Sequence, residues 1–231
     1  MKIFTQCIVA FVFIVSFCIV APQKAISEMS DKSKLAENAE QKSNQTDREK
    51  KAYEVFEKIL ILSGKSDDKD VFKEIEALYL EIIREYSDTA LAQECYWRLV
   101  MLYVEKSTPP MFEKAENLYA EFLEKYPKSV VRNLIVESLS KSYLKNGNLE
   151  KLLKLNAPLV EAFYATGELS NPSPLFMYAE AQFNIGNLGE AEKAYKSLIK
   201  SFPNSRLAYS SKKRLNEIQK KGKTTDTPRT Q

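Results

Sequence analysis

The 231-residue chain contains no histidine, and this absence excludes several kinds of site. Hydrolases with a histidine base, HExxH metalloproteases and Cys₂His₂ zinc sites all need an imidazole. No P-loop, GxGxxG, CxxC or GxSxG motif is present, and the six glycines are dispersed along the chain. The sequence therefore predicts no enzyme, no metal site and no cofactor.

The chain also lacks a large excess of charge of one sign. Its 34 Lys and Arg residues stand against 31 Asp and Glu residues, which gives a net charge of +3. Nucleic-acid-binding proteins usually gather a basic excess on one surface. The balance therefore predicts a protein that binds no nucleic acid, and the length allows one large or two small domains.

The longest apolar run lies near the N-terminus, at residues 8–21. It is too short for a membrane-spanning helix of about 20 residues and suits the apolar region of a secretory signal peptide. We expect residues 1–27 to be a signal peptide, cleaved before Glu28 or near Ala21, and an uncleaved anchor is the alternative. Lipidation at Cys18 is disfavoured, because lipoprotein signals carry a small residue before the cysteine and Phe17 stands there.

Removal of residues 1–27 changes the charge and the cysteine count of the chain. It takes away Lys2 and Lys24 and no acid, so the net charge falls from +3 to +1. Cys95 is then the only cysteine, which excludes an intramolecular disulfide. Because its neighbours are Tyr96 and Trp97, we expect this thiol to be buried and unreactive.

Two polar stretches flank the central region. Residues 28–47 contain only Met29 and Leu35 as large apolar side chains. Such a stretch buries too little apolar surface to offset its chain entropy, so it predicts a disordered linker. Residues 221–231 are polar in the same way and predict a disordered tail.

Residues 48–220 show apolar side chains at helical spacing and no alternating strand pattern. This predicts an all-α fold, an α-solenoid of about four antiparallel helix hairpins with a C-terminal capping helix. The expected helices are 48–63, 70–86, 89–105, 111–126, 129–145, 149–166, 174–185, 188–201 and 205–220. The last of them carries its apolar face on Leu207, Ala208, Ser211, Leu215 and Ile218.

The central region also repeats itself about every 40 residues. Segments 72–89, 112–129 and 189–205 align through a small or apolar residue, an aromatic four residues later and an apolar residue three further on. All of these lie on one helix face. A serine or proline follows each helix, and Pro127 and Pro203 prevent it from continuing.

At these residues the chain resembles the tetratricopeptide repeat (TPR) family, in the style of exported bacterial envelope members. These include the outer-membrane β-barrel assembly lipoprotein and the Tol–Pal-associated periplasmic TPR protein. The unit at 178–203 matches the motif at Ala179, Gly186, Ala191, Tyr195, Leu198 and Pro203. Gln182 departs from it, since the family has an aromatic there. The 136–164 unit departs in its second half, where Pro158 predicts a kinked or split helix.

The resemblance implies a concave groove lined by the first helix of each hairpin. Carried onto this chain, the partner-binding positions are Trp97, Met101, Val104, Glu137, Lys141, Lys145, Phe176, Glu180 and Phe183. For Trp97 and Phe176 the alternative is packing within the solenoid. Chaperone-binding members hold a carboxylate with Lys and Asn at groove positions, and this Asn is missing, so that activity is not expected.

The sequence therefore predicts a non-enzymatic scaffold of the bacterial cell envelope that binds another envelope protein or peptide segment. Its expected location is the periplasm or the periplasmic face of a membrane, with membrane contact only if the N-terminus is retained or lipidated. One alternative is a self-associating structural scaffold that forms a homo-oligomer. Another is a lipid-anchored component of an outer-membrane assembly, pilus or secretion machine.

Overall fold

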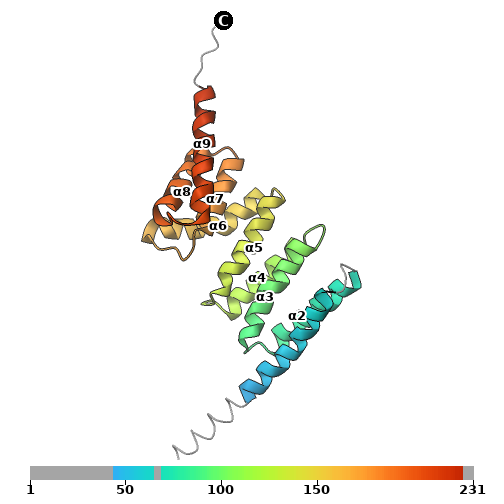
Figure 1. Ribbon diagram of the computed structural model, residues 1–231. Coiled ribbons are helices and arrows are strands. Elements are labelled where there is room, and N and C mark those ends of the chain that lie inside the picture. Colours follow the sequence, from blue (N-terminus) through green and yellow to red (C-terminus); the bar gives the residue numbers. More distant parts are fainter. Residues whose placement is uncertain (1–43, 65–68, 226–231) are drawn as a thin grey trace, which may run out of the picture.

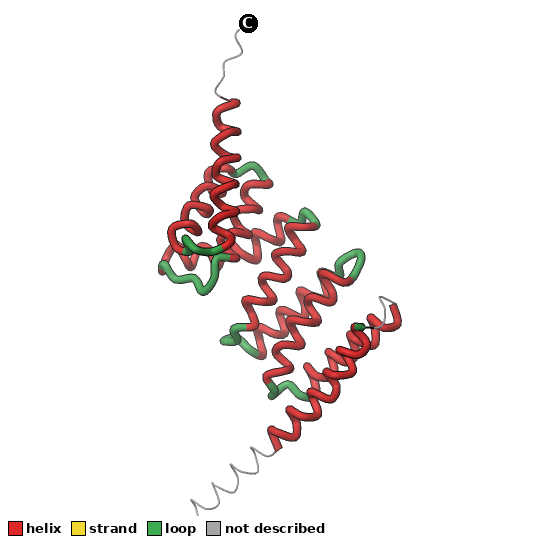
Figure 2. Tube along the Cα trace, viewed as in Figure 1, coloured by secondary structure: helices red, strands yellow, loops and turns green. Residues whose placement is uncertain are grey.

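The computed structural model describes residues 44–64 and 69–225, and every regular element in them is helical. A helix at 44–63 comes first. It is followed by α2 (Lys69–Glu85), α3 (Ala90–Met101), the π-helical turn η1 (Leu102–Lys106), α4 (Phe112–Lys125), α5 (Val131–Lys145), α6 (Leu149–Thr166), α7 (Ser173–Asn184), α8 (Leu188–Ser201) and α9 (Arg206–Thr225). Short loops join the helices from α2 to α9 (Figure 2). The expected all-α solenoid is confirmed.

The helices stack in chain order as antiparallel pairs (Figure 1). The first helices of the pairs, α3, α5, α7 and the end helix α9, contact one another in succession. The second helices α2, α4, α6 and α8 make few contacts with one another, since none of their pairs is among the contacting elements. The first helices therefore lie on the inner side of the curved stack, and we call their exposed side the inner face.

The apolar side chains form one long core and two smaller ones. The long core runs from Ala52 to Ala181 through the buried side chains of the first hairpins. The smaller clusters centre on Leu198 and on Tyr195, between α6 and α9. Each hairpin therefore buries its apolar face only by stacking on its neighbours, as in other repeat proteins.

The helix ends follow from the residues that the repeat places there. The N–H of Tyr126 bonds the Phe122 carbonyl at 2.8 Å, and the N–H of Phe202 bonds the Leu198 carbonyl at 2.8 Å. A proline follows in both cases, so the helix stops. The turns inside two hairpins need a positive φ, which Gly147 and Gly186 adopt at 72° and 91°.

Two boundaries differ from the sequence-based expectation. α6 has the expected bounds, and it is continuous through Pro158 rather than split, because its apolar side remains packed at Val160 and Phe163. Residues 44–47, assigned to the linker, are helical, and the Arg48 guanidinium anchors this end with a 2.7 Å bond to Asp88. Residues 221–225, assigned to the tail, continue α9.

α9 covers the open apolar end of the stack. Ala208 and Ser211 are fully buried, and Ile218 is buried in the cluster that includes Tyr195. This confirms the expected capping helix. Cys95 is fully buried, and burial raises the pKa of its thiol to about 12, as expected for an unreactive cysteine.

No helix among residues 44–64 and 69–225 is long and apolar enough to cross a membrane. Residues 8–21, on which the expected signal peptide depends, lie outside the described residues. The cleavage site and the Cys18 position lie outside them as well.

Candidate partner-binding surface

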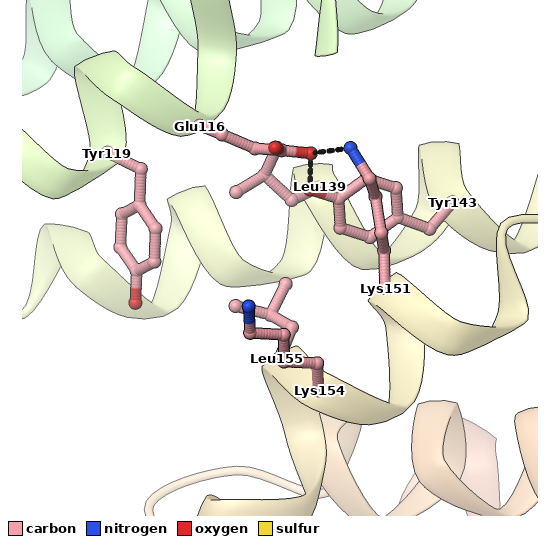
Figure 3. Close-up of a pocket in the computed structure, with 7 residues that line it drawn as sticks. All are labelled: Glu116, Tyr119, Leu139, Tyr143, Lys151, Lys154 and Leu155. Carbon is pink, nitrogen blue, oxygen red and sulfur yellow. Dashed lines mark hydrogen bonds and ion pairs between the residues drawn. The ribbon is translucent and has the colours of Figure 1, made fainter. Parts of the chain in front are cut away.

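A carboxylate bracket joins each of two hairpins to the next one. The Glu76 carboxylate of α2 accepts a 2.7 Å hydrogen bond from the Tyr103 hydroxyl and a 2.7 Å ion pair from Lys114. Forty residues later, the Glu116 carboxylate of α4 accepts 2.6 Å bonds from the Tyr143 hydroxyl and from Lys151 (Figure 3). A glutamate, a tyrosine and a lysine thus connect neighbouring hairpins in the same way at two places in the stack.

The electrostatics of the bracket favour the charged carboxylate. Burial by itself raises the pKa of Glu116, but the bonds from Lys151 and Tyr143 outweigh it and hold this pKa below its usual value. Burial and the bond to Glu116 raise the pKa of the Tyr143 hydroxyl, which therefore stays a donor. The bracket is a structural device that fixes the spacing of the inner-face helices.

The bracket does not continue into the next hairpin. The turn bond from the Asn148 N–H to the Tyr143 carbonyl recurs from the Asn187 N–H to the Gln182 carbonyl, both at 2.9 Å, so Gln182 stands in the tyrosine position. When the hydrogen bonds at the helix starts are aligned between hairpins, Leu153 takes the position of the bracket carboxylate. In the same alignment, Glu190 takes the position of the bracket lysine. The C-terminal hairpin is therefore held in another way.

A buried glutamate on α7 replaces the bracket there. Glu180 is 4% exposed and accepts a 2.6 Å bond from the Tyr195 hydroxyl. The Arg214 guanidinium of α9 reaches both of its oxygens, at 2.9 and 2.8 Å. Because Glu180 is buried and satisfied inside the protein, its expected place in the groove is wrong, and it is a docking residue for α9.

The expected groove residues of α3 and η1 divide between surface and core. Trp97 is half-buried, and its indole N–H donates a 3.1 Å bond to Ser138 of α5, so it lies on the inner face and also ties two first helices together. Met101 is half-buried beside it in the helix. Val104 is 4% exposed, so its expected groove role is wrong and it belongs to the core.

The α5 positions form the charged part of the inner face. Glu137 is half-buried and pairs with Lys141 at 2.5 Å, one turn away. Lys141 and Lys145 are both exposed. On α7, Phe176 and Phe183 are half-buried, so their rings are part core and part surface.

The sequence analysis missed an exposed apolar group on the first helix. Tyr53, Leu60 and Ile61 are 57%, 55% and 60% exposed, and they are the most apolar exposed group on this helix. Leu60 and Tyr53 are seven residues apart, which places them on one side of the helix. The signal was present as Ile59–Leu62, a run with more apolar residues than one buried face of a helix requires.

The hollows of the described surface include three that lie between neighbouring helices. One of about 190 Å³ lies between α2 and α3 beside Met101, and one of about 310 Å³ lies between α4 and α6 beside Glu116 (Figure 3). The third, of about 400 Å³, lies between α7 and α9 beside Phe176. No group of three acid, cysteine or histidine side chains in the described part of the chain is arranged to hold a metal ion.

Comparison with known proteins supports the predicted repeat over one segment of the chain. No curated protein and no solved structure gave a match to the chain. Residues 175–205, which span α7, α8 and the Pro203 turn, match the family model of the tetratricopeptide repeat. The hairpin of α7 and α8 is therefore similar to a tetratricopeptide repeat, and it lies within an all-α stack of helix hairpins.

Proposed function

We propose that the protein is a scaffold of the bacterial cell envelope that binds a segment of another envelope protein on its inner face. The observation that carries the proposal is the composition of that face, where exposed apolar side chains lie next to charged ones. To this face the proposal assigns the exposed Tyr53, Leu60 and Ile61 of the first helix as its apolar part, and the exposed Lys141 and Lys145 of α5 as its charged part. Tetratricopeptide repeats generally mediate protein–protein interactions, which supports this assignment.

The rigidity of the stack supports the same function. The brackets at Glu76 and Glu116 fix neighbouring hairpins, so the inner face is formed before a partner arrives. A preformed surface loses less conformational entropy on binding than a flexible one. The apolar run at residues 8–21 supports export, and it favours a partner in the periplasm or on the periplasmic face of a membrane.

Site-specific photo-crosslinking tests the inner face. A benzophenone amino acid replaces Leu60 or Lys141 in the full chain, expressed in bacterial cells, and a matched variant carries it at Glu124, an exposed residue of α4. The proposal expects one discrete adduct from Leu60 and Lys141 and none from Glu124. The adduct is identified by mass spectrometry, and fractionation locates it in the envelope. Equal adducts from all three positions, or none from the inner face, contradict the proposal.

Self-association is the second candidate, and the exposed Tyr53, Leu60 and Ile61 favour it because two such patches bury each other in a symmetric dimer. Light scattering at increasing protein concentration separates the two candidates. A dimer that dissociates on Leu60→Ser supports self-association. A monomer at all concentrations leaves the inner face to a different protein.

A further inference from the structure

The hollow of about 310 Å³ drawn in Figure 3 lies on the side of α5 away from the inner face. Leu139 and Tyr143 of α5 line it, together with residues of α4 and α6. Leu139 is two residues away from both Glu137 and Lys141 of the inner face, and two residues turn a helix by about 200°. We therefore call this hollow the outer pocket, since it is separate from the surface assigned to the partner segment.

The charges that line the outer pocket sum to +1. Glu116 is the one carboxylate among the lining residues, and Lys151 holds it at 2.6 Å. Lys154 is a second, exposed ammonium, and it forms no hydrogen bond or ion pair with a described residue. It attracts Glu116 only at longer range, and this is the smallest of the influences on the pKa of that carboxyl. Glu150, one turn before Lys154 on α6, is outside the lining. The pocket therefore carries one positive charge in excess.

The bracket of the preceding hairpins has no counterpart of this second lysine. Lys114 in that bracket corresponds to Lys151, so the same spacing assigns Asn117 to the position of Lys154. The charges at the corresponding positions, Glu76 and Lys114, cancel each other. Because that bracket forms without a second lysine, the stacking of hairpins does not account for Lys154.

The outer pocket also offers a hydroxyl donor and an apolar wall. Tyr119 of α4 is half-buried, and its hydroxyl forms no hydrogen bond with a described residue. In the view of Figure 3, this hydroxyl and the Lys154 ammonium lie on the side of the pocket away from the bracket ion pair. Leu139 is buried and Leu155 is half-buried, so both present alkyl groups to the same hollow.

We propose that the outer pocket binds an apolar monocarboxylate, a ligand with one carboxylate joined to an apolar body about as large as one side chain. The carboxylate pairs with the Lys154 ammonium and accepts a hydrogen bond from the Tyr119 hydroxyl. The apolar body lies against Leu139 and Leu155. The volume is at the lower end of the range for small-molecule pockets, which suits a ligand of this size.

The charge balance favours a carboxylate over a phosphate group. One carboxylate balances the single excess charge of the outer pocket. A phosphate monoester carries between one and two negative charges at pH 7, so part of its charge would lie unbalanced beside Glu116. The inference goes beyond the proposed scaffold function and does not depend on it, because the two sites lie on opposite sides of α5.

Saturation-transfer NMR with the purified full chain tests the proposal. The probe is 3-phenylpropanoate. One matched ligand is 3-phenylpropanamide, which lacks the charge, and another is acetate, which lacks the apolar body. The proposal expects saturable binding of the probe that weakens as salt increases. Each matched ligand should bind at least about tenfold more weakly. Binding of the amide or of acetate as tight as that of the probe overturns the proposal.

Two variants locate the binding in the outer pocket. Lys154→Gln removes the exposed ammonium and should weaken probe binding by about tenfold, and Tyr119→Phe removes the hydroxyl and should weaken it by about threefold. Neither residue is part of a bracket, so circular dichroism should show native helix content in both variants. Lys200→Gln, the matched change on the exposed side of α8, should change binding by less than about twofold. An equal loss with Lys200→Gln, or no loss with Lys154→Gln, contradicts the proposal.

A competing peptide distinguishes two sources of the carboxylate. Acetyl-Ala-Ala-Phe presents a benzyl group and a carboxylate at the end of a polypeptide, and its C-terminal amide lacks the carboxylate. Displacement of the probe by the acid form alone assigns the pocket to the last residue of another chain. If neither form displaces the probe, the pocket takes a free small acid. Displacement by both forms to the same extent shows that the charge is not recognised and rejects the proposal.

Discussion

The Tyr143 hydroxyl donates a 2.6 Å hydrogen bond to the Glu116 carboxylate across the boundary between two hairpins. The same pair recurs forty residues earlier as Tyr103 and Glu76, at 2.7 Å. In both cases the tyrosine hydroxyl of one hairpin therefore donates a hydrogen bond to a carboxylate of the hairpin before it. Three experiments follow from this relationship and from the contacts that replace it at the C-terminal end, and a fourth tests the burial of Cys95.

Tyr143→Phe should lower the free energy of unfolding by about 1–2 kcal/mol, because it removes one hydrogen bond to a charged group and keeps the ring. Urea denaturation followed by circular dichroism measures the change. Tyr119→Phe is the matched control, since its hydroxyl forms no hydrogen bond with a described residue, and it should change stability by less than about 0.5 kcal/mol. Equal effects of both variants would show that the bracket adds no stability.

Glu180→Gln should destabilise the docking of α9 by about 2–4 kcal/mol, because it leaves the Arg214 guanidinium without its buried partner. Hydrogen exchange should show faster exchange in α9 than in α3, which the substitution does not touch. Glu217→Gln breaks the exposed half of the same pair and should have a much smaller effect. Uniform loss of protection across all helices would contradict a local docking role.

Cys95 should resist alkylation in the folded protein at pH 8. Burial raises the pKa of this thiol to about 12, so only a very small fraction is thiolate at that pH. Iodoacetamide labelling followed by peptide mass spectrometry reports on Cys95 separately from Cys7 and Cys18. Labelling should become rapid in 6 M guanidinium chloride, and rapid labelling of the native chain would contradict the buried position.

Acidification should destabilise the protein through the bracket carboxylates. The pKa values of Glu76 and Glu116 are lower in the folded chain than their usual value of about 4.3, so the unfolded chain binds protons more readily. Their contribution is fully present above the unfolded pKa and is lost as the pH falls from about 5 through the folded values. Urea titrations at several pH values measure this loss, and Glu116→Gln should make the dependence shallower. An unchanged slope in that variant would rule out Glu116 as a source.

Most of the fold was predictable because it depends on local rules. The helical spacing of apolar residues located each helix to within a few residues, and Gly186 and Pro203 marked the turn and the end of the best-matching repeat. Pro158 does not split α6, since packing at Val160 and Phe163 keeps the helix continuous. Local propensity against proline is overridden when the surrounding helix face is buried.

The inner face was less predictable than the helices. Each residue of error in the repeat frame rotates a side chain by about 100° around its helix, so neighbouring positions exchange core and surface. Val104 and Glu180 were expected at the surface and are buried. Tyr53, Leu60 and Ile61 were missed because the aligned repeat segments begin at residue 72, and a repeat pattern cannot assign the faces of a helix that lies before them.

The sequence by itself determined the absence of histidine chemistry, the positions of the helices and the turns between them, because these depend on residue type and short-range spacing. Only the tertiary structure decided which carboxylates bind side chains of a neighbouring helix. Glu116 and Glu180 have the same side chain, but one fixes two hairpins beneath Tyr143 and the other docks α9 through Arg214. The difference arises from which helix lies against each of them, and that depends on contacts between residues far apart in the chain.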